Sequence, residues 1–167
     1  RGLVSHFIGA IRGGSQYRRA SFLLDCAGQQ VFPDWFALSE RPHLPRALAS
    51  APFDHEGVAT QDRELVAGGV LLGYVLSTYS ARKLGLRTTG NAGGNHNLIL
   101  DNNAPLEFSA LLKKMDKGLL VTELLGHGVN SVTGDYSRGA AGYWVEGGEI
   151  RHAVEEITIA GNLKDML

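Results

Sequence analysis

Residues 122–159 read TELLGHGVNSVTGDYSRGAAGYWVEGGEIRHAVEEITI. Glycines run through this stretch, and segments of alternating apolar and polar residues flank the pair Gly147-Gly148. A glycine pair adopts the positive φ angles that a two-residue hairpin turn requires. The pattern therefore predicts a β-hairpin that joins residues 142–145 to residues 150–159.

The polar, glycine-rich residues that lead into this hairpin predict a loop. Its charged and hydroxyl-bearing cluster is Asp135, Tyr136, Ser137 and Arg138, and His127 lies upstream. Two interpretations remain open. Asp135 and Arg138 could pair locally and stiffen a turn, or the loop could face a peptide or a partner beside a free strand edge.

Apolar residues at positions 3, 4, 7, 8 and 11 predict an amphipathic helix over residues 2–11, which Gly13-Gly14 is expected to end. The pair Gly68-Gly69 predicts a second hairpin, between residues 63–67 and 70–76. The short turns favour antiparallel pairing. The expected fold class is therefore α+β, mainly antiparallel β-sheet with a few short helices. Further short strands are expected at 29–32, 35–39, 98–100 and 119–125, and helices at 77–84, 105–115 and from 162 onward. Residues 88–97 predict a polar, glycine-rich loop.

The length and composition of the chain exclude several classes of protein and kinds of site. A chain of 167 residues forms one domain or a large part of one. Its formal net charge of −1 argues against direct nucleic-acid binding. The single Cys26 excludes an internal disulfide and a multi-cysteine metal site, and no apolar run reaches the roughly 18 residues of a membrane span. Because Arg1 is not a start methionine, we expect this chain to be part of a longer protein.

No catalytic motif is complete. No two of the six histidines lie within five positions of each other, so the chain lacks the ligand pair of a zinc helix. Ser80 and Lys83 match S-x-x-K without the accompanying motifs, and no G-x-S-x-G occurs. Gly126-His127-Gly128 lacks the third glycine of a dinucleotide loop.

Several long strings nevertheless resemble the PmbA/TldD family, and specifically its PmbA (TldE) branch. They are the opening stretch with its continuation VEEITIAGNLKDML, and further GLVSHFIGAIRGGSQYRRASFLLD, FPDW, RPHLPRALASAPFDHEGVATQDRELV and YSARKLGLRTTGNAGG. The resemblance covers essentially the whole chain. It implies that residues 1–167 form most of a β-rich C-terminal domain, without the family's N-terminal domain and last strands.

The resemblance also implies a function. Members of this branch work in the cytoplasm with a TldD-like catalytic subunit, as a heterodimeric zinc metallopeptidase that acts on extended, unfolded peptides. The reactions include leader-peptide removal during the maturation of a modified peptide antibiotic, and degradation of an antitoxin. An older family name, modulator of DNA gyrase, implies the alternative of a regulatory binding protein without proteolysis. Neither nucleic acid nor membrane is an expected direct partner, and self-association of the isolated domain stays open.

The catalytic branch carries His-Glu-x-x-x-His on a helix, in which the two histidines bind zinc and the glutamate activates water. Aligned on Gly9, this chain has Ser5 and Ala10 at the ligand positions and His6 at the glutamate position. A shift by one residue puts His6 at the first ligand, but Phe7 and Ile11 at the other two positions. The resemblance therefore implies no catalytic or metal-binding residue here, an inactive chain when alone, and zinc in the partner subunit.

Overall fold

The computed structural model describes residues 2–101 and 105–167. The chain divides into two compact units. The first comprises Arg1–Asn103, Ser131–Thr133 and Met166–Leu167, and the second comprises Ala104–Asn130 and Gly134–Asp165.

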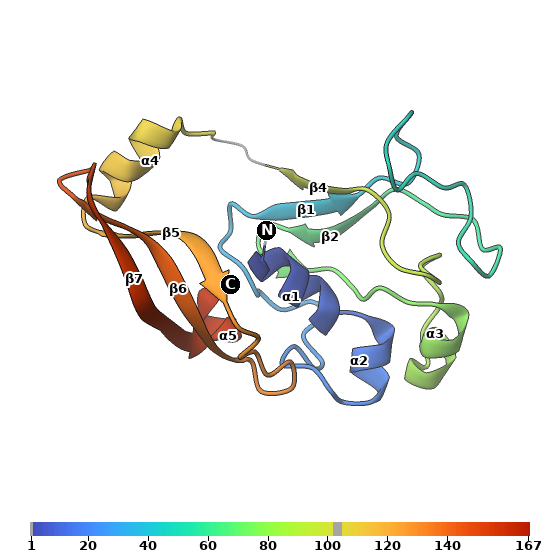
Figure 1. Ribbon diagram of the computed structural model, residues 1–167. Helices are drawn as coiled ribbons and strands as arrows, with labels where there is room; N and C mark the ends of the chain where they lie inside the picture. The colour runs from blue at the N-terminus through green and yellow to red at the C-terminus, as the bar shows by residue number, and fades with distance from the viewer. Residues whose placement is uncertain (1, 102–104) are drawn as a thin grey trace. The chain divides into compact units, whose positions relative to one another are not determined.

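A four-stranded antiparallel sheet in the order β3-β2-β1-β4 forms the centre of the first unit (Figure 1). The elements of this unit, in chain order, are α1 (Gly2–Ala10), α2 (Gly13–Tyr17), β1 (Ala37–Glu40), β2 (Arg63–Ala67), β3 (Val70–Leu71), α3 (Thr78–Leu84) and β4 (Leu98–Asp101). The helix predicted at residues 2–11 and the glycine hairpin after Ala67 are both confirmed.

The core of the first unit joins α1 to the segment before β1. Phe7 and Ile11 are fully buried at 0% exposure. The Phe7 ring meets the Phe32 ring edge-on at 4.9 Å between centroids, and Phe32 stacks on Phe36 at 3.8 Å. Burying such aromatic and aliphatic side chains is the main stabilising contribution in a domain of this size.

The pair Gly13-Gly14 begins α2, so the expectation that it only ends the first helix was incomplete. A Cβ on Gly13 would lie 2.3 Å from the Ser80 Oγ of α3, so only glycine lets α2 and α3 approach this closely. Ser77 caps α3 and Gly85, in the left-handed conformation, ends it.

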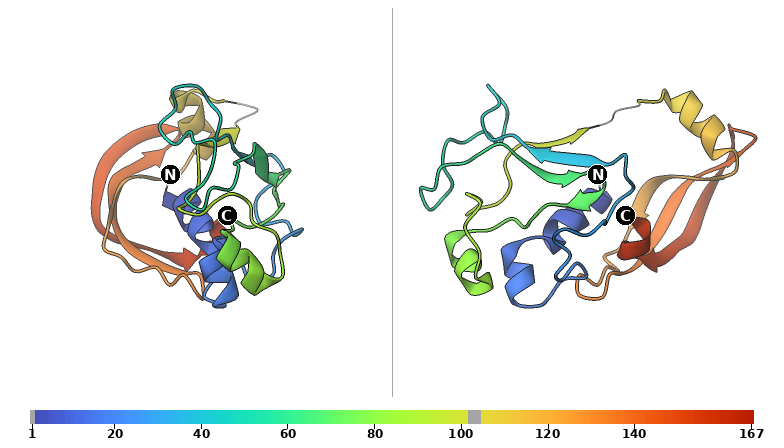
Figure 2. Two further views of the ribbon diagram at one scale, coloured as in Figure 1. Left: turned by 90° about the vertical axis from the view of Figure 1, so that its right-hand side faces the viewer. Right: turned by 180° about the vertical axis from the view of Figure 1, so that it is seen from behind.

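The second unit is a three-stranded antiparallel sheet in the order β5-β6-β7, preceded by a helix (Figure 1). Its elements are α4 (Phe108–Met115), β5 (Gly118–Leu125), β6 (Asp135–Glu146), β7 (Glu149–Asn162) and α5 (Leu163–Met166). Figure 2 shows this sheet strongly curved. The register shifts along both strand pairs, and such bulges bend a sheet.

The hairpin across Gly147-Gly148 is confirmed, but the loop predicted at Asp135–Arg138 is wrong, because β6 begins at Asp135. The error came from interpreting glycine density as a loop signal. A Cβ on Gly142 would lie 2.0 Å from the Leu120 carbonyl oxygen of the neighbouring strand. Glycine here therefore permits close strand packing, not a turn.

Two of the expected strands differ from the structure. Residues 29–32 form only an isolated bridge, between Gln30 and Val70, instead of a strand. The segment expected as a strand over 70–76 ends early as β3, because Val75 pairs instead with the turn between α1 and α2. The α+β class with mainly antiparallel sheets is confirmed. Among the described residues, no helix has the length and apolar character to cross a membrane.

Candidate functional site

The α1 positions at which the catalytic branch would carry zinc ligands differ in exposure. Ser5 is exposed, His6 is half-buried, and Ala10 is buried at 3% exposure. Ala10 offers only a methyl group. In the shifted register, Phe7 and Ile11 would have to be base and ligand, yet both point into the core at 0% exposure. Within residues 2–101 and 105–167, no group of three or more His, Cys, Asp or Glu side chains is arranged to hold a metal ion.

The C-terminal end of α1 is fixed by side chains from the chain that follows it. The Ala10 carbonyl accepts hydrogen bonds from Gln16 Nε2 at 2.7 Å and Ser21 Oγ at 2.8 Å, and the Gly9 carbonyl accepts one from Ser15 Oγ at 2.9 Å. Gln16 also donates to the Leu23 carbonyl at 3.0 Å. These bonds satisfy carbonyls that a helix end otherwise leaves unpaired, and they make the turn between α1 and α2 rigid.

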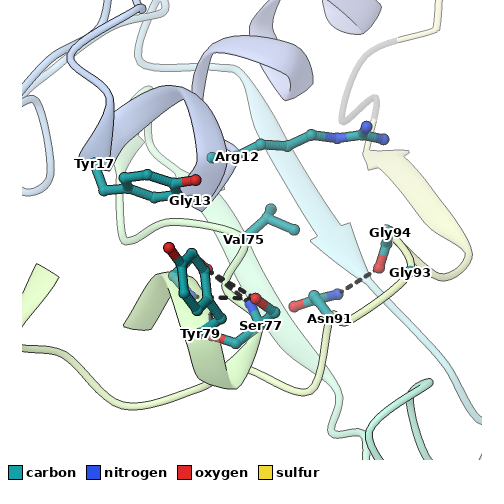
Figure 3. Close-up of a pocket in the computed structure, with 11 residues that line it drawn as sticks. Arg12, Gly13, Tyr17, Val75, Ser77, Tyr79, Asn91, Gly93 and Gly94 are labelled. Atoms are coloured by element: carbon teal, nitrogen blue, oxygen red, sulfur yellow. Dashed lines mark hydrogen bonds between the residues drawn. The ribbon is translucent and has the colours of Figure 1, made fainter. Parts of the chain in front are cut away.

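A groove of about 310 Å³ opens beside this turn (Figure 3). Tyr17 and Tyr79 stand on one side of it, with their rings edge to face at 5.7 Å, while Asn91 and the Gly93-Gly94 backbone form the other side. Arg12 extends over the groove toward Gly94. Among the residues that the structure describes, no acidic side chain lines the groove.

The Gly90–Asn97 segment that forms one wall of the groove is held by two buried carboxylates. Glu40, at 1% exposure, accepts from Asn91 Nδ2 at 2.9 Å and from the His96 N–H at 2.7 Å. Arg63 Nε donates to the second Glu40 oxygen at 3.0 Å and balances its charge. Burial lowers the pKa of Arg63, and the charge and hydrogen bond of Glu40 offset part of that effect.

Asp54 is the second carboxylate, at 3% exposure. Its Oδ2 accepts from the Ala92 N–H at 2.9 Å, and its Oδ1 accepts from the Val58 and Glu56 N–H groups at 3.0 and 2.9 Å. Burial alone would raise the pKa of Asp54, but these three backbone donors outweigh it and hold the pKa below its ordinary value. The glycine-rich wall is therefore pre-formed.

Arg12 also borders a second hollow, about 790 Å³ in volume, between α1 and the sheet. The hollow is lined mainly by apolar side chains: Val4, Ile8, Leu38, Leu98 and Leu100. Across the described parts of the chain, the Arg12 guanidinium forms no hydrogen bond or ion pair, and the residue is exposed. A cation without a protein partner thus stands between a polar groove and an apolar hollow.

The other predicted site residues belong to the second unit. His127 lies exposed in the turn after β5. Tyr136, at 5% exposure, and Ser137 lie in β6, and the Ser137 N–H donates to the Gly128 carbonyl. Asp135 Oδ1 accepts from Asn162 at 3.2 Å, and Arg138 Nη2 donates to the Leu124 carbonyl at 3.2 Å. Asp135 and Arg138 therefore each bond within their own sheet.

Sequence reasoning did not identify the groove. It treated residues 88–97 as a polar, glycine-rich loop and gave Arg12 no role. The available signal was the combination of this glycine-rich loop with Glu40 and Asp54, which lie in segments of otherwise unremarkable composition. Their burial depends on distant backbone donors, which no local pattern reveals.

Comparisons with known proteins identify the family of the chain. All 167 residues match the model of the PmbA/TldA metallopeptidase C-terminal domain. The chain is 61% identical to the metalloprotease PmbA homolog of Haemophilus influenzae and 58% identical to the metalloprotease PmbA of Escherichia coli O157:H7. Each match covers 99% of this chain, but only 37% and 36% of the respective relatives.

Solved structures agree in fold. A protein of Bacteroides thetaiotaomicron, described as a candidate modulator of DNA gyrase, superposes with a TM-score of 0.91 at 34% identity, over 98% of this chain and 37% of that one. TldE from Thermococcus kodakarensis superposes with a TM-score of 0.82 at 25% identity, over 99% of this chain and 40% of that one.

Proposed function

Since this chain belongs to the family of PmbA/TldA metallopeptidase C-terminal domains, we propose that it is part of the non-catalytic partner subunit of a TldD-type zinc metallopeptidase. The catalytic subunit would supply the zinc and the general base. The subunit that contains this chain would complete the enzyme and help to bind unfolded peptide substrates. The complex would work in the cytoplasm.

The observation that carries the proposal is the chemistry of α1. Zinc in a peptidase needs imidazole or carboxylate ligands and one open coordination position for water. Ser5 and Ala10 provide neither ligand type, and the buried Ala10 site leaves little room for a larger side chain. In the shifted register, Phe7 cannot accept a proton and Ile11 cannot bind metal, so neither register supports water activation.

Co-expression tests the proposal. The full-length protein, tagged and expressed with a TldD-type subunit, should capture that subunit as its dominant partner. The purified pair should cleave an unfolded peptide, whereas the tagged protein alone should not. The matched variants are His6→Ala in this chain and a glutamate-to-glutamine change in the partner's His-Glu-x-x-x-His motif. The first should leave the cleavage rate of the pair within about two-fold, and the second should abolish cleavage.

Loss of cleavage by His6→Ala in a pair that still assembles would assign chemistry to this chain and defeat the proposal. The alternative function is a regulatory protein that binds DNA gyrase or another target without proteolysis, and it is supported by the description of the Bacteroides thetaiotaomicron relative as a candidate modulator of DNA gyrase. It predicts that the pull-down recovers that target instead of a TldD-type subunit, and that no peptide is cleaved.

A further inference from the structure

We propose that the groove beside the turn between α1 and α2 binds the C-terminal carboxylate of a peptide, with Arg12 as the anchor. This inference rests on the proposed function, because that function supplies the reason to expect a peptide as the ligand. It gives this subunit a specific recognition task, separate from the zinc chemistry.

The first support is the unpaired cation. The guanidinium of an arginine carries five N–H donors, and two of them match the two oxygens of a carboxylate. The exposed Arg12 guanidinium forms no hydrogen bond or ion pair among the described residues, so its donors can reach a ligand. Glu40, which holds the groove residue Asn91, is buried and already paired with Arg63.

The second support is the charge around the groove. The Arg18 guanidinium carbon lies 5.2 Å from the Tyr17 ring centroid, and Lys83 Nζ lies 5.7 Å from that of Tyr79. Both tyrosines line the groove, so each brings a cation to its rim. Two acids lie nearby and both are engaged: the Glu56 carboxylate accepts from the Thr78 N–H at 2.8 Å, and the buried Asp54 carboxylate accepts from the Ala92 N–H at 2.9 Å. In a chain of net charge −1, this local excess of cations favours an anionic ligand.

The third support is the wall of the groove. Gly93 and Gly94 expose backbone instead of side chains, and the two buried carboxylates described above fix their segment. A Cβ on Gly94 would point toward Arg12, 3.9 Å from its Nη2. Its absence leaves space beside the guanidinium. A pre-formed wall lowers the ordering cost of binding.

The apolar hollow on the other side of Arg12 selects the source of the carboxylate. A C-terminal residue carries its carboxylate and its side chain on the same Cα, so the carboxylate can pair with Arg12 while an apolar side chain enters the hollow lined by Ile8, Leu38 and Leu100. An aspartate or glutamate side chain carries no apolar side chain beside its carboxylate. We therefore expect a preference for peptides that end in a free apolar residue.

Fluorescence anisotropy of a fluorescein-labelled Gly-Gly-Leu-Leu peptide tests this, using the full-length protein without its catalytic partner. The free acid should bind about ten-fold more tightly than the C-terminal amide, the loss expected for one charge-assisted contact in a partly open site. Arg12→Gln should remove that preference, and Arg12→Lys should retain part of it. Arg87→Gln, which removes an exposed arginine that does not line the groove, is the matched control and should change nothing.

Equal binding of acid and amide would overturn the proposal, and so would an Arg12→Gln protein that binds like Arg87→Gln. An amidated peptide with an internal glutamate is the third arm. If it binds as tightly as the free acid, the preference for a C-terminus is wrong. Each variant is also tested for capture of the TldD-type subunit. If Arg12→Gln loses the preference for the free acid but still captures the TldD-type subunit, the result supports the role of Arg12 in peptide binding. If the wild-type protein fails to capture that subunit, the result contradicts the proposed function instead.

Discussion

Replacing Glu40 by glutamine tests the buried anchor of the groove wall. The substitution conserves size but exchanges one carboxylate oxygen for an NH₂ group. Four donors converge on the Glu40 carboxylate: Arg63, Asn91 and the His96 backbone at 2.7 to 3.0 Å, and Asn95 Nδ2 at 3.4 Å. The new NH₂ group would face one of these donors, and Arg63 would lose its counter-charge.

The expected cost follows from the environment of the pair. Removing one partner of a buried ion pair costs about 3–5 kcal/mol in unfolding free energy. The Arg63 side chain is 20% exposed, so water can still reach it. The low end, about 3 kcal/mol, therefore applies. For a domain of this size that equals a fall of about 6–12 °C in Tm.

Urea denaturation of the full-length protein, followed by tryptophan fluorescence, measures the change. Glu64→Gln is the matched control, because Glu64 pairs with Arg41 at a site where both side chains are substantially exposed, 42% and 30%. That pair should contribute less than about 1 kcal/mol. Hydrogen exchange should also speed up across residues 90–97 in the Glu40→Gln protein. Equal destabilisation by the two substitutions would refute the reasoning.

Three further outcomes are expected. Gly142→Ala should lower the unfolding free energy by about 1–3 kcal/mol, because the new Cβ would lie 2.0 Å from the Leu120 carbonyl oxygen. Gly73→Ala is the control in the same denaturation assay. It should be nearly neutral, because no atom lies within 4 Å of the new Cβ. Because the folded-state pKa of Asp54 is lowered, its stabilising contribution is complete above the unfolded pKa of about 3.9 and is lost as the pH falls through the lower folded value. Asp54→Asn should therefore be less stable at neutral pH and should flatten the acid limb of stability against pH; an unchanged acid limb would contradict this assignment. Arg12→Gln should leave the unfolding free energy within about 0.5 kcal/mol, since the exposed Arg12 side chain forms no hydrogen bond or ion pair among the described residues, and a larger loss would show a structural role.

Local sequence patterns predicted those parts of the fold that depend on local chemistry. The turn Gly147-Gly148 needs positive φ at two successive residues, and only glycine meets this without strain. The helix α1 follows from apolar spacing, and its buried Phe7 and Ile8 are residues that this spacing selects.

The patterns failed where glycine serves contacts with distant chain segments. Gly142 in β6 and Gly13 at the start of α2 are required by neighbouring atoms, of Leu120 and Ser80, that the local sequence does not reveal. The same holds for the groove. Its wall depends on carboxylates that lie far along the chain, so composition predicted only a polar, glycine-rich loop where the fold builds a fixed surface.

Metal content tests the central claim most directly. The full-length protein is purified alone and together with its TldD-type subunit, and zinc is measured by elemental analysis alongside peptide cleavage. We expect one zinc ion per heterodimer, none retained by this subunit alone, and cleavage only by the pair. Stoichiometric zinc with peptide cleavage by this subunit alone would contradict the account.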